Sequence, residues 1–509
     1  MTEDKAASTE GKPTPKAVPK EERERRKQVR RRWQLLQRVR QAVQLLLLAL
    51  FLFLVYQTTR KGVDSLPVNL FSRFDPLMAL VSMIAARKFI TNMIPALVTI
   101  VVTLALGRVW CGWICPMGTV LDLYGPRQTP RLPEWFRKIK YFLFFAVLTG
   151  ALLGSLAVLW LDPITIFVRP LAGAVYPAIL RQTTPVTVTK TLTSTATVAD
   201  KVVKAGVPTA PKPFIYPLLA VPLVILLALN LLGRRFWCRY LCPLGAWVAL
   251  LSKFAWFKRN VSDACVACKA CFKACPMQTI DQNKHFESDP GECLQCWTCF
   301  SKCPTAAIYY EGKASAGFGH SYDPSRRQML ASLVVGVGGT LLLKSDMLKK
   351  KYAYLIRPPG AKEDEFLSKC IRCGQCVKGC PNNALHLSGV MGGLESLWTP
   401  ILIPRIGPCD YGCNTCGKVC PTQAIPKLSL EEKRKAVLGT AVLNTDTCIR
   451  CLICIKECPV QGALVKGKIE GKKGDYPLVN ANLCIGCGVC EYVCPVKGEA
   501  AIRVHAPGA

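Results

Sequence analysis

Residues 448–459 read CIRCLICIKECP, a Cys-x2-Cys-x2-Cys-x3-Cys-Pro run. Three closely spaced thiolates and a fourth followed by proline are the bacterial ferredoxin arrangement for holding a [4Fe–4S] cube. Six runs of this kind, one with a Cys-x3-Cys opening, use 24 of the 28 cysteines, at four per run. The sequence therefore predicts an iron–sulfur electron-transfer protein. The six runs occupy residues 265–276, 293–304, 370–381, 409–421, 448–459 and 484–495.

Other uses of so many cysteines fit the spacing poorly. Zinc sites take their ligands as two separated pairs, so a third cysteine two residues on has no role in them. Disulfide frameworks are typical of short secreted chains, and this chain has 509 residues. None of the four histidines follows a Cys-x-x-Cys, so no haem is expected. We expect six [4Fe–4S] clusters.

Each run is followed by a short turn and an apolar residue where a strand can begin. Such a unit is too small to bury a core without its cluster, so metal binding and folding should be coupled. In two-cluster ferredoxins the fourth cysteine of one run ligates the cluster of the other run. The first two runs are therefore expected to hold one cube on Cys265, Cys268, Cys271 and Cys303, and another on Cys293, Cys296, Cys299 and Cys275.

The rest of the chain is apolar and basic, with 50% hydrophobic residues and a net charge of +33. Residues 1–40 are predicted to be a disordered basic tail at the cytoplasmic membrane surface. Nucleic-acid binding is the rival explanation for this charge. It is disfavoured because the basic stretch abuts a long apolar segment rather than a nucleic-acid-reading module. The expected partner is membrane lipid, not nucleic acid.

Four apolar segments approach the length needed to cross a bilayer core of about 30 Å. A fifth, at 328–343, is shorter, and 75–86 is expected to be interfacial or re-entrant. The predicted fold class is a multi-pass α-helical membrane domain with α+β ferredoxin-like polycluster domains. The four segments are 41–57, 90–107, 140–161 and 214–232. The predicted domains are the tail 1–40, a four-span membrane domain 41–233, a dicluster domain 234–325, a fifth span 326–345 and a tetracluster domain 346–509.

The basic tail before the first span predicts a cytoplasmic N-terminus, which returns the first two runs to the cytoplasm. The stretch SRRQML at 325–330 is similar to a twin-arginine export signal, and no clear cleavage site follows it. We expect a retained fifth span and a periplasmic C-terminal domain. The alternative is a buried helix and a cytoplasmic C-terminal half, because the lysines at 349–351 run against the positive-inside tendency.

The remaining four cysteines form a second repeat, WCGWICPMG at 110–118 and WCRYLCPLG at 237–245. If each segment is helical, its two cysteines face the same side, and the proline favours an end to the helix. We expect Cys111, Cys115, Cys238 and Cys242 to converge as an intramembrane redox relay. A bound quinone or a partner subunit are the other candidates for bridging the membrane. Buried packing or simple disulfides are the alternative roles for these cysteines.

Residues about 40–310 resemble the NapH-type membrane ferredoxins, through the four spans, the two Cys-x3-Cys-Pro motifs and two ferredoxin runs. Residues about 325–509 are similar to NapG- or MauM-type ferredoxins, through the twin-arginine start, RPPGA at 357–361 and four runs. The resemblance implies a quinol dehydrogenase module in the bacterial inner membrane. Its electrons would leave the quinone pool for a periplasmic cytochrome or reductase.

The resemblance also implies a nested pairing of the last four runs, the first with the fourth and the second with the third. In that pairing Cys494 joins Cys370, Cys373 and Cys376; Cys380 joins Cys484, Cys487 and Cys490; Cys458 joins Cys409, Cys413 and Cys416; and Cys420 joins Cys448, Cys451 and Cys454.

Two functions of different classes follow from these features. The first is an electron conduit from quinol, or from a cytoplasmic donor, to a periplasmic acceptor in anaerobic respiration. The second is an assembly factor that supplies electrons for maturation of a periplasmic metalloenzyme. Six clusters favour conduction. No nucleophile constellation, phosphate loop or flavin-attachment motif stands out, so the sequence leaves open whether the chain is itself a quinol dehydrogenase.

Overall fold

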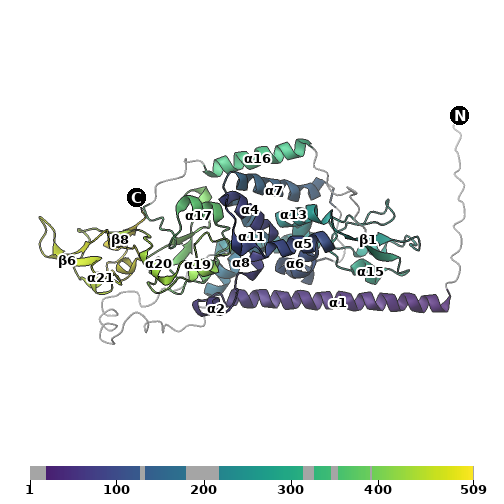
Figure 1. The fold of residues 1–509 in the computed structure, drawn as a ribbon, viewed down its shortest axis with the longest axis horizontal. Helices are drawn as coiled ribbons and strands as arrows, with labels where there is room; N and C mark the ends of the chain where they lie inside the picture. The colour runs from purple at the N-terminus through teal and green to yellow at the C-terminus, as the bar shows by residue number, and fades with distance from the viewer. Residues whose placement is uncertain are drawn as a thin grey trace.

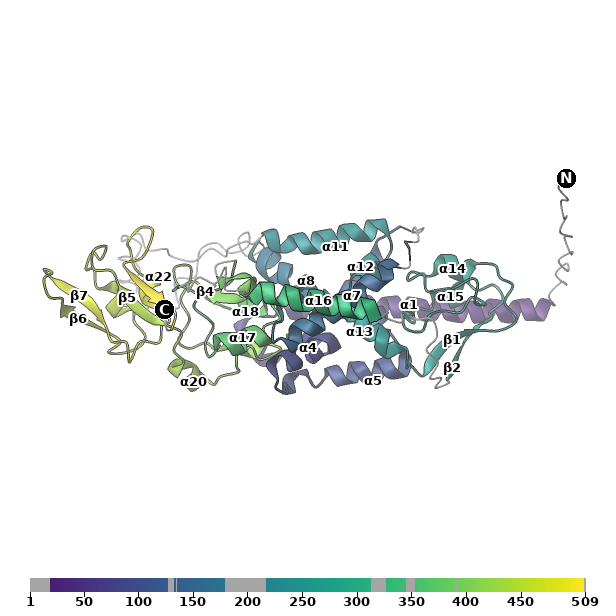
Figure 2. The same cartoon turned by 90° about the horizontal axis from the view of Figure 1, so that it is seen from above.

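The computed structural model describes residues 19–126, 132–133, 135–178, 217–312, 326–344, 353–389 and 392–507. The molecule is elongated, with a helical bundle in the middle and a cysteine-rich domain at each end (Figures 1 and 2). The first two runs lie beside β1 (Phe257–Val261) at one end, and the last two lie beside β6 (Leu464–Lys468) at the other. The bundle therefore separates the two groups of runs.

The long helix α1 (Lys20–Tyr56) runs without a break from the basic stretch into the first apolar segment. The prediction of a disordered tail is therefore wrong for residues 20–40, whereas residues 1–18 lie outside the described residues. The basic stretch is built from Glu, Arg, Lys and Gln, which favour helix. The indole ring of Trp33 packs on two rings of the dicluster domain. Its centroid lies 4.3 Å from that of Phe300 and 5.8 Å from that of Trp297, and these contacts hold the basic half of α1 against that domain.

Two hydrogen bonds fix the same contact. Arg30 Nε donates to the carbonyl oxygen of Ser301 at 3.0 Å, and the Ser301 hydroxyl donates to Gln37 Oε1 at 2.7 Å. The basic half of α1 is thus held by a few residues on one face, spaced within a highly charged sequence.

The bundle is made of α1 and of helices contributed by residues 60–252, with α16 (Arg326–Lys344) added from beyond the dicluster domain. Helix α7 is central and packs against α4, α12, α13 and α16. Side chains such as Leu77, Tyr141 and Ala246 are at most 1% exposed in its core. Its other elements are α2 (Arg60–Ser65), α3 (Leu70–Arg73), α4 (Pro76–Ala86), η1 (Thr91–Met93), α5 (Ala96–Leu106), η2 (Trp110–Ile114), α6 (Pro116–Leu123), α7 (Trp135–Leu152), η3 (Ala157–Leu161), α8 (Pro163–Pro170), η4 (Leu171–Val175), η5 (Pro217–Ala220), α11 (Val221–Leu232), α12 (Phe236–Tyr240) and α13 (Pro243–Ser252).

The bundle extends past its predicted boundary at residue 233. Helix α13 belongs to it, since Val248 and Ala249 are fully buried in the same core as α4 and α7. The second Cys-x3-Cys-Pro motif is thus enclosed by the bundle rather than standing at its edge.

Within the described residues, one helix, α1, is both long and apolar enough to cross a membrane. Four further apolar helical segments are shorter than the roughly 20 residues that a straight crossing needs. The predicted span 140–161 is divided, because α7 ends at Leu152 and a separate turn, η3, follows. The shorter apolar segments are Pro76–Ala86, Thr91–Leu106, Pro217–Leu232 and Pro243–Ser252.

The cysteine-rich domains are built from two-stranded antiparallel sheets and short helices. In the dicluster domain β1 pairs with β2 (Ile308–Gly312), with Phe257 opposite Gly312. The C-terminal domain holds three such pairs, β3–β4, β5–β8 and β6–β7. These remaining elements are α14 (Ala270–Ala274), α15 (Thr298–Lys302), α17 (Glu363–Lys369), α18 (Gln375–Lys378), β3 (Leu385–Leu387), η8 (Leu394–Ser396), β4 (Pro400–Leu402), α19 (Thr415–Val419), α20 (Leu430–Lys435), β5 (Thr440–Leu443), α21 (Ile453–Lys456), β7 (Asp475–Val479), α22 (Val489–Tyr492) and β8 (Ile502–His505).

Candidate iron–sulfur centres

Five of the six runs share one backbone conformation around their second cysteine. The residues before and after that cysteine are left-handed, with φ between 50° and 80°. Left-handed backbone costs a residue with a side chain about 1–2 kcal/mol, so a repeated pattern marks loops shaped for a task. In the described chain the fourth run, with its longer opening, lacks this pattern. The left-handed residues are Ala267, Lys269, Gln295, Trp297, Arg372, Gly374, Arg450, Leu452, Gly486 and Gly488.

The dicluster domain encloses two cavities, each lined by four cysteines. Their volumes are about 330 and 390 Å³. In both, three cysteines come from one run and the fourth from the other run, the grouping predicted from the sequence. The first cavity is lined by Cys265, Cys268, Cys271 and Cys303, and the second by Cys293, Cys296, Cys299 and Cys275.

The last two runs form a similar pair of cavities, of about 340 and 330 Å³. Four cavities of similar volume and identical cysteine number fit the same kind of group. One is lined by Cys458, Cys484, Cys487 and Cys490, and the other by Cys494, Cys448, Cys451 and Cys454.

The third and fourth runs also exchange their fourth cysteines. Cys420 interacts electrostatically with Cys370, Cys373 and Cys376. Cys380 is likewise grouped with Cys409, Cys413 and Cys416.

The nested pairing of the last four runs is therefore wrong. Strands β3 and β4 pair between the third and fourth runs, and β5, before the fifth run, pairs with β8, after the sixth. Each of these sheets closes two neighbouring runs into one unit. The C-terminal domain is thus two successive dicluster units.

The cysteines surround cavities rather than converge on a point. No three His, Cys, Asp or Glu side chains in the described ranges are placed to hold a single metal ion. Burial raises the pKa of Cys293, of Cys373 and of Cys454 to about 12. These thiols are therefore protonated at neutral pH without metal, and cluster binding must displace the protons.

The cysteine sets follow one another along the molecule. Cys376 interacts electrostatically with Cys416, and Cys487 with Cys409. The backbone N–H of Cys409 also donates to the carbonyl oxygen of Cys487 at 2.8 Å, which joins the two C-terminal units. Cys490 interacts electrostatically with Cys454 of the last set, so the C-terminal domain arranges its four sets in an unbranched order.

The bundle touches a cysteine set at each end. Cys275 and Cys296 of the dicluster domain pack against the bundle core, and Cys373 of the C-terminal domain is part of the same core cluster. Arg169 of α8 donates to the carbonyl oxygen of Arg372 at 2.9 Å, beside Cys373.

The four cysteines of the Cys-x3-Cys-Pro motifs are all buried within the bundle. Cys111 and Cys238 interact electrostatically with both Cys115 and Cys242, so the four thiols form one buried group. Each motif breaks its helix before the second cysteine. That cysteine then caps the next helix, α6 or α13, whose first residue is the proline. Proline is well suited to the first position of a helix, and here it starts one rather than only ending another.

Two arginines at matching positions flank these cysteines, Arg108 and Arg235, and both are fully buried. Arg235 pairs with Asp122, with Nη2 2.6 Å from Oδ2, and its Nη1 donates to the carbonyl oxygen of Cys111 at 2.9 Å. Arg108 Nη1 lies 2.7 Å from Glu292 Oε2 of the dicluster domain. Both arginines are therefore in buried ion pairs.

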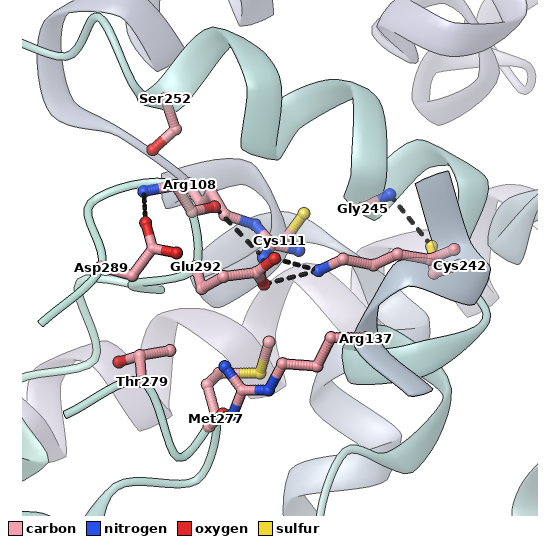
Figure 3. A network of polar contacts seen from close by, with 12 residues as sticks. Arg108, Cys111, Arg137, Cys242, Gly245, Ser252, Met277, Thr279, Asp289 and Glu292 are labelled. Atoms are coloured by element: carbon pink, nitrogen blue, oxygen red, sulfur yellow. Dashed lines mark hydrogen bonds and ion pairs between the residues drawn. The ribbon is translucent and has the colours of Figure 1, made fainter. Parts of the chain in front are cut away.

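Glu292 is the centre of the contact between bundle and dicluster domain (Figure 3). Lys140 Nζ pairs with both of its oxygens, and the Tyr141 hydroxyl donates to Oε1 at 2.8 Å. Burial would raise the pKa of this carboxyl, but Lys140 and Arg108 hold it down at about 2. The only sign of this role in the sequence is that Glu292 directly precedes Cys293.

Two buried aspartates in the bundle are also absent from the residues predicted from the sequence. Asp75 and Asp162 each precede a proline and cap a helix, α4 and α8. Oδ1 of Asp75 accepts from the backbone N–H of Leu77, and Oδ2 of Asp162 from that of Ile164, at 2.8 and 2.9 Å. The two carboxyl groups interact electrostatically with each other. Asp before Pro is a readable capping signal, and its duplication accompanies the repeated cysteine motif.

Comparison with known proteins identifies iron–sulfur domains along most of the chain. Residues 89–140 and 214–262 match a family model described as a 4Fe-4S binding domain. Residues 264–313, 292–385, 408–463 and 447–498 match models of 4Fe-4S dicluster domains. No solved structure matches the chain.

The methylamine utilization ferredoxin-type protein MauM of Methylorubrum extorquens is 39% identical over 167 residues, which are 30% of this chain and 74% of that protein. The chain belongs to the MauM ferredoxin-type family. MauM of Methylobacillus flagellatus is 37% identical over 182 residues, 32% of this chain and 76% of its own. The ferredoxin-type protein NapG of Escherichia coli is 36% identical over 148 residues, 26% of this chain and 63% of its own. The MauM likeness lies in the C-terminal region, and the protein is a ferredoxin-type iron–sulfur electron-transfer protein.

Proposed function

We propose that this protein carries electrons across a bacterial inner membrane, from the quinol pool to a periplasmic cytochrome or reductase. The helical bundle, with a NapH-type role, would lie in the membrane. The dicluster domain would face the cytoplasm with the N-terminus, and the MauM-type domain would face the periplasm. The proposal rests on one observation about the surface of the bundle.

Helix α16 has small residues inside and large apolar residues outside. Its buried side chains are Ser332 and Thr340, with Gly336 beside them, whereas Val334 and Leu342 are 66% and 70% exposed. A Cβ at Gly336 would come within 2.8 Å of Thr149 Cβ on α7, so the two helices are in close contact there. Small residues at the contact and large apolar residues outside are typical of helices packed in lipid.

Two other helices also bury polar side chains and expose large apolar ones. Helix α5 buries Thr99 and Thr103 and exposes Val101 at 64%. Helix α11 buries Asn230 and exposes Leu231 at 65%. Surfaces as apolar as these are rare on monomeric soluble proteins and support contact with lipid.

The charge distribution supports the orientation. The basic half of α1 lies along the dicluster domain (Figure 1). Arg326 and Arg327 open α16 at that same end, and the helix runs towards the C-terminal domain. Basic residues gather on the cytoplasmic side of membrane proteins, so this end would be cytoplasmic. The close packing of α16 on α7 supports its retention as a span.

The 24 cysteines of the six runs would each ligate one of six [4Fe–4S] clusters. When bound, such clusters accept and release single electrons. The cysteine loops fix the order of the sites, and the four cysteines of the bundle would relay electrons between the dicluster domain and a quinone in the bundle.

The test is anaerobic mixing of the purified protein with a reduced menaquinone analogue, followed by cluster absorbance and EPR. Prompt partial bleaching is expected. If dithionite bleaches the clusters and the quinol does not, quinol is not the donor. A role in maturing another protein's metal centre would then be the better explanation.

Topology has a separate test in living cells. Reporter fusions after residues 312 and 509 should show cytoplasmic and periplasmic activity, respectively. Cytoplasmic activity at both positions would contradict the transmembrane arrangement while leaving the clusters in place.

A further inference from the structure

We propose that Cys111, Cys115, Cys238 and Cys242 together hold a seventh iron–sulfur cluster inside the bundle. This inference rests on the proposed function and deepens it, because it gives the redox relay a cofactor.

The four thiols form a complete ligand set supplied equally by two matched motifs. Their residues are between 4% and 7% exposed, and all four are free. Iron–sulfur clusters of the [2Fe–2S] and [4Fe–4S] types take four cysteine ligands. In each motif the first cysteine lies in a short helical turn. The second cysteine lies at the N-cap of the next helix.

The spacing of these thiols favours a cluster over a single ion. A structural zinc site would need four sulfurs about 2.3 Å from one point. These cysteines, like the four-cysteine sets of the ferredoxin cavities, do not converge in that way.

The surroundings are suited to an anionic group. The backbone N–H of Gly245 donates to Cys242 Sγ at 3.2 Å (Figure 3), the same contact and distance that Ala384 makes with Cys380 Sγ in a ferredoxin set. Hydrogen bonds of this kind stabilise cluster thiolates and tune their potentials.

A buried guanidinium supplies further unmet donors. Arg108 Nη2 has no hydrogen-bond partner, and a Cβ at Gly245 would lie 3.0 Å from it. It therefore reaches the loop that carries Cys242. Arg108 also interacts electrostatically with Cys111 and Cys238. Arg108 is paired with Glu292 through Nη1 only, so its free Nη2 donor beside four thiols is suited to the negative charge that four thiolates on a cluster provide.

The site is next to an existing cysteine set. Gly112, which follows Cys111, is so close to the dicluster domain that a Cβ there would lie 2.2 Å from the carbonyl oxygen of Leu294. Leu294 follows Cys293, and Arg235 interacts electrostatically with Cys296. The loops of the two sites are thus in contact. The 4Fe-4S binding-domain matches at 89–140 and 214–262 each include one of the motifs.

The test counts iron, acid-labile sulfide and zinc per chain in the anaerobically purified full-length protein. We expect about 28 iron atoms in the unaltered chain and about 24 in Cys111→Ser, for a [4Fe–4S] cluster. A loss of about two would identify a [2Fe–2S] cluster. Cys242→Ser, from the other motif, should lose the same amount, and the double variant no more, since all four cysteines serve one cluster.

The control is Met117→Leu, a buried volume-conserving change two residues after the second ligand of the first motif that should keep all its iron. Equal iron in the unaltered chain and both cysteine variants, or loss of one zinc in place of iron, overturns the inference. Bleaching by quinol is measured on the same samples. The iron count then tests the seventh cluster, and the bleaching tests quinol oxidation independently.

Discussion

At the scale of single residues, Glu292 decides how the dicluster domain meets the bundle. Its carboxylate is in contact with Lys140 and Arg108, both fully buried, and accepts a hydrogen bond from Tyr141. Two buried cations share one buried anion here. Such a group is costly to assemble, and breaking it is costlier, because the remaining charges are left without a partner.

Replacing Glu292 with glutamine should lower the free energy of unfolding by about 3–5 kcal/mol. Glutamine keeps the size and the hydrogen-bond acceptor but leaves Lys140 and Arg108 without a counter-charge. The measurement is denaturant titration in detergent, followed by cluster absorbance. The exposed control Glu470→Gln should change stability by less than about 0.5 kcal/mol. A Glu292→Gln protein as stable as that control would show that the ion cluster does not hold the domains together.

The same carboxyl predicts acid sensitivity. Because its folded pKa of about 2 is below the ordinary value of 4.5 for a glutamate, Glu292 contributes stability above pH 4.5. That contribution is lost as the pH falls towards 2. Between pH 5 and 3 the unaltered protein should therefore lose more stability than Glu292→Gln. Parallel stability curves for the two proteins over this range would refute the assignment.

At the scale of elements, α1 shows how one helix can belong to two environments. Its basic half packs on the dicluster domain through Trp33, and its apolar half packs in the bundle through Phe51 and Leu54. Glu22 and Arg26 also pair one turn apart on the exposed side of the basic half. The order of that half therefore depends mainly on a few contacts at one face.

Changing Trp33 to alanine should loosen the basic half of α1 and leave the apolar half in place. Hydrogen exchange should speed up at least tenfold over residues 20–36 and stay unchanged over 45–56, since loss of a large aromatic contact costs over 1 kcal/mol. Leu35→Ala is the matched control, because Leu35 is 62% exposed. Equal exchange in the two variants would mean that Trp33 does not anchor the helix.

The sequence was sufficient for features set by local spacing. The cysteine runs and the exchange of Cys275 and Cys303 follow from spacing alone. The pairing of the last four runs does not, because it depends on which strands meet, and β5 reaches β8 across both runs. The helical basic stretch was missed for a similar reason, since its ordering comes from Trp297 and Phe300, far along the chain.

At the scale of the whole molecule, the cysteine sets form one ordered series from the dicluster domain to the C-terminus. The first cysteine set beyond the bundle contains Cys373. The last cysteine set contains Cys451, which is exposed. An unbranched order makes the sets unequal, because losing an inner one separates all those beyond it from the donor.

Cys373→Ser and Cys451→Ser should therefore differ, although each removes one cluster ligand. With quinol as reductant, Cys373→Ser should bleach less than half as much as the unaltered protein, because the three sets beyond it are cut off. Cys451→Ser should lose only the part of the quinol bleaching that comes from the last cysteine set. The reference for each variant is its own bleaching by dithionite. Full quinol bleaching of Cys373→Ser, relative to dithionite, would contradict the series.

The contacts between the bundle and the C-terminal domain include polar ones such as Asn69 to the carbonyl oxygen of Val419 and Lys378 to that of Tyr56. Because α16 joins the two parts in one polypeptide, these contacts form intramolecularly, at an effective concentration of order millimolar for a short tether. A free subunit relying on the same contacts would need to be present at about that concentration. A single polypeptide therefore keeps this joint closed at any protein concentration, with the bundle and the C-terminal domain always in equal number.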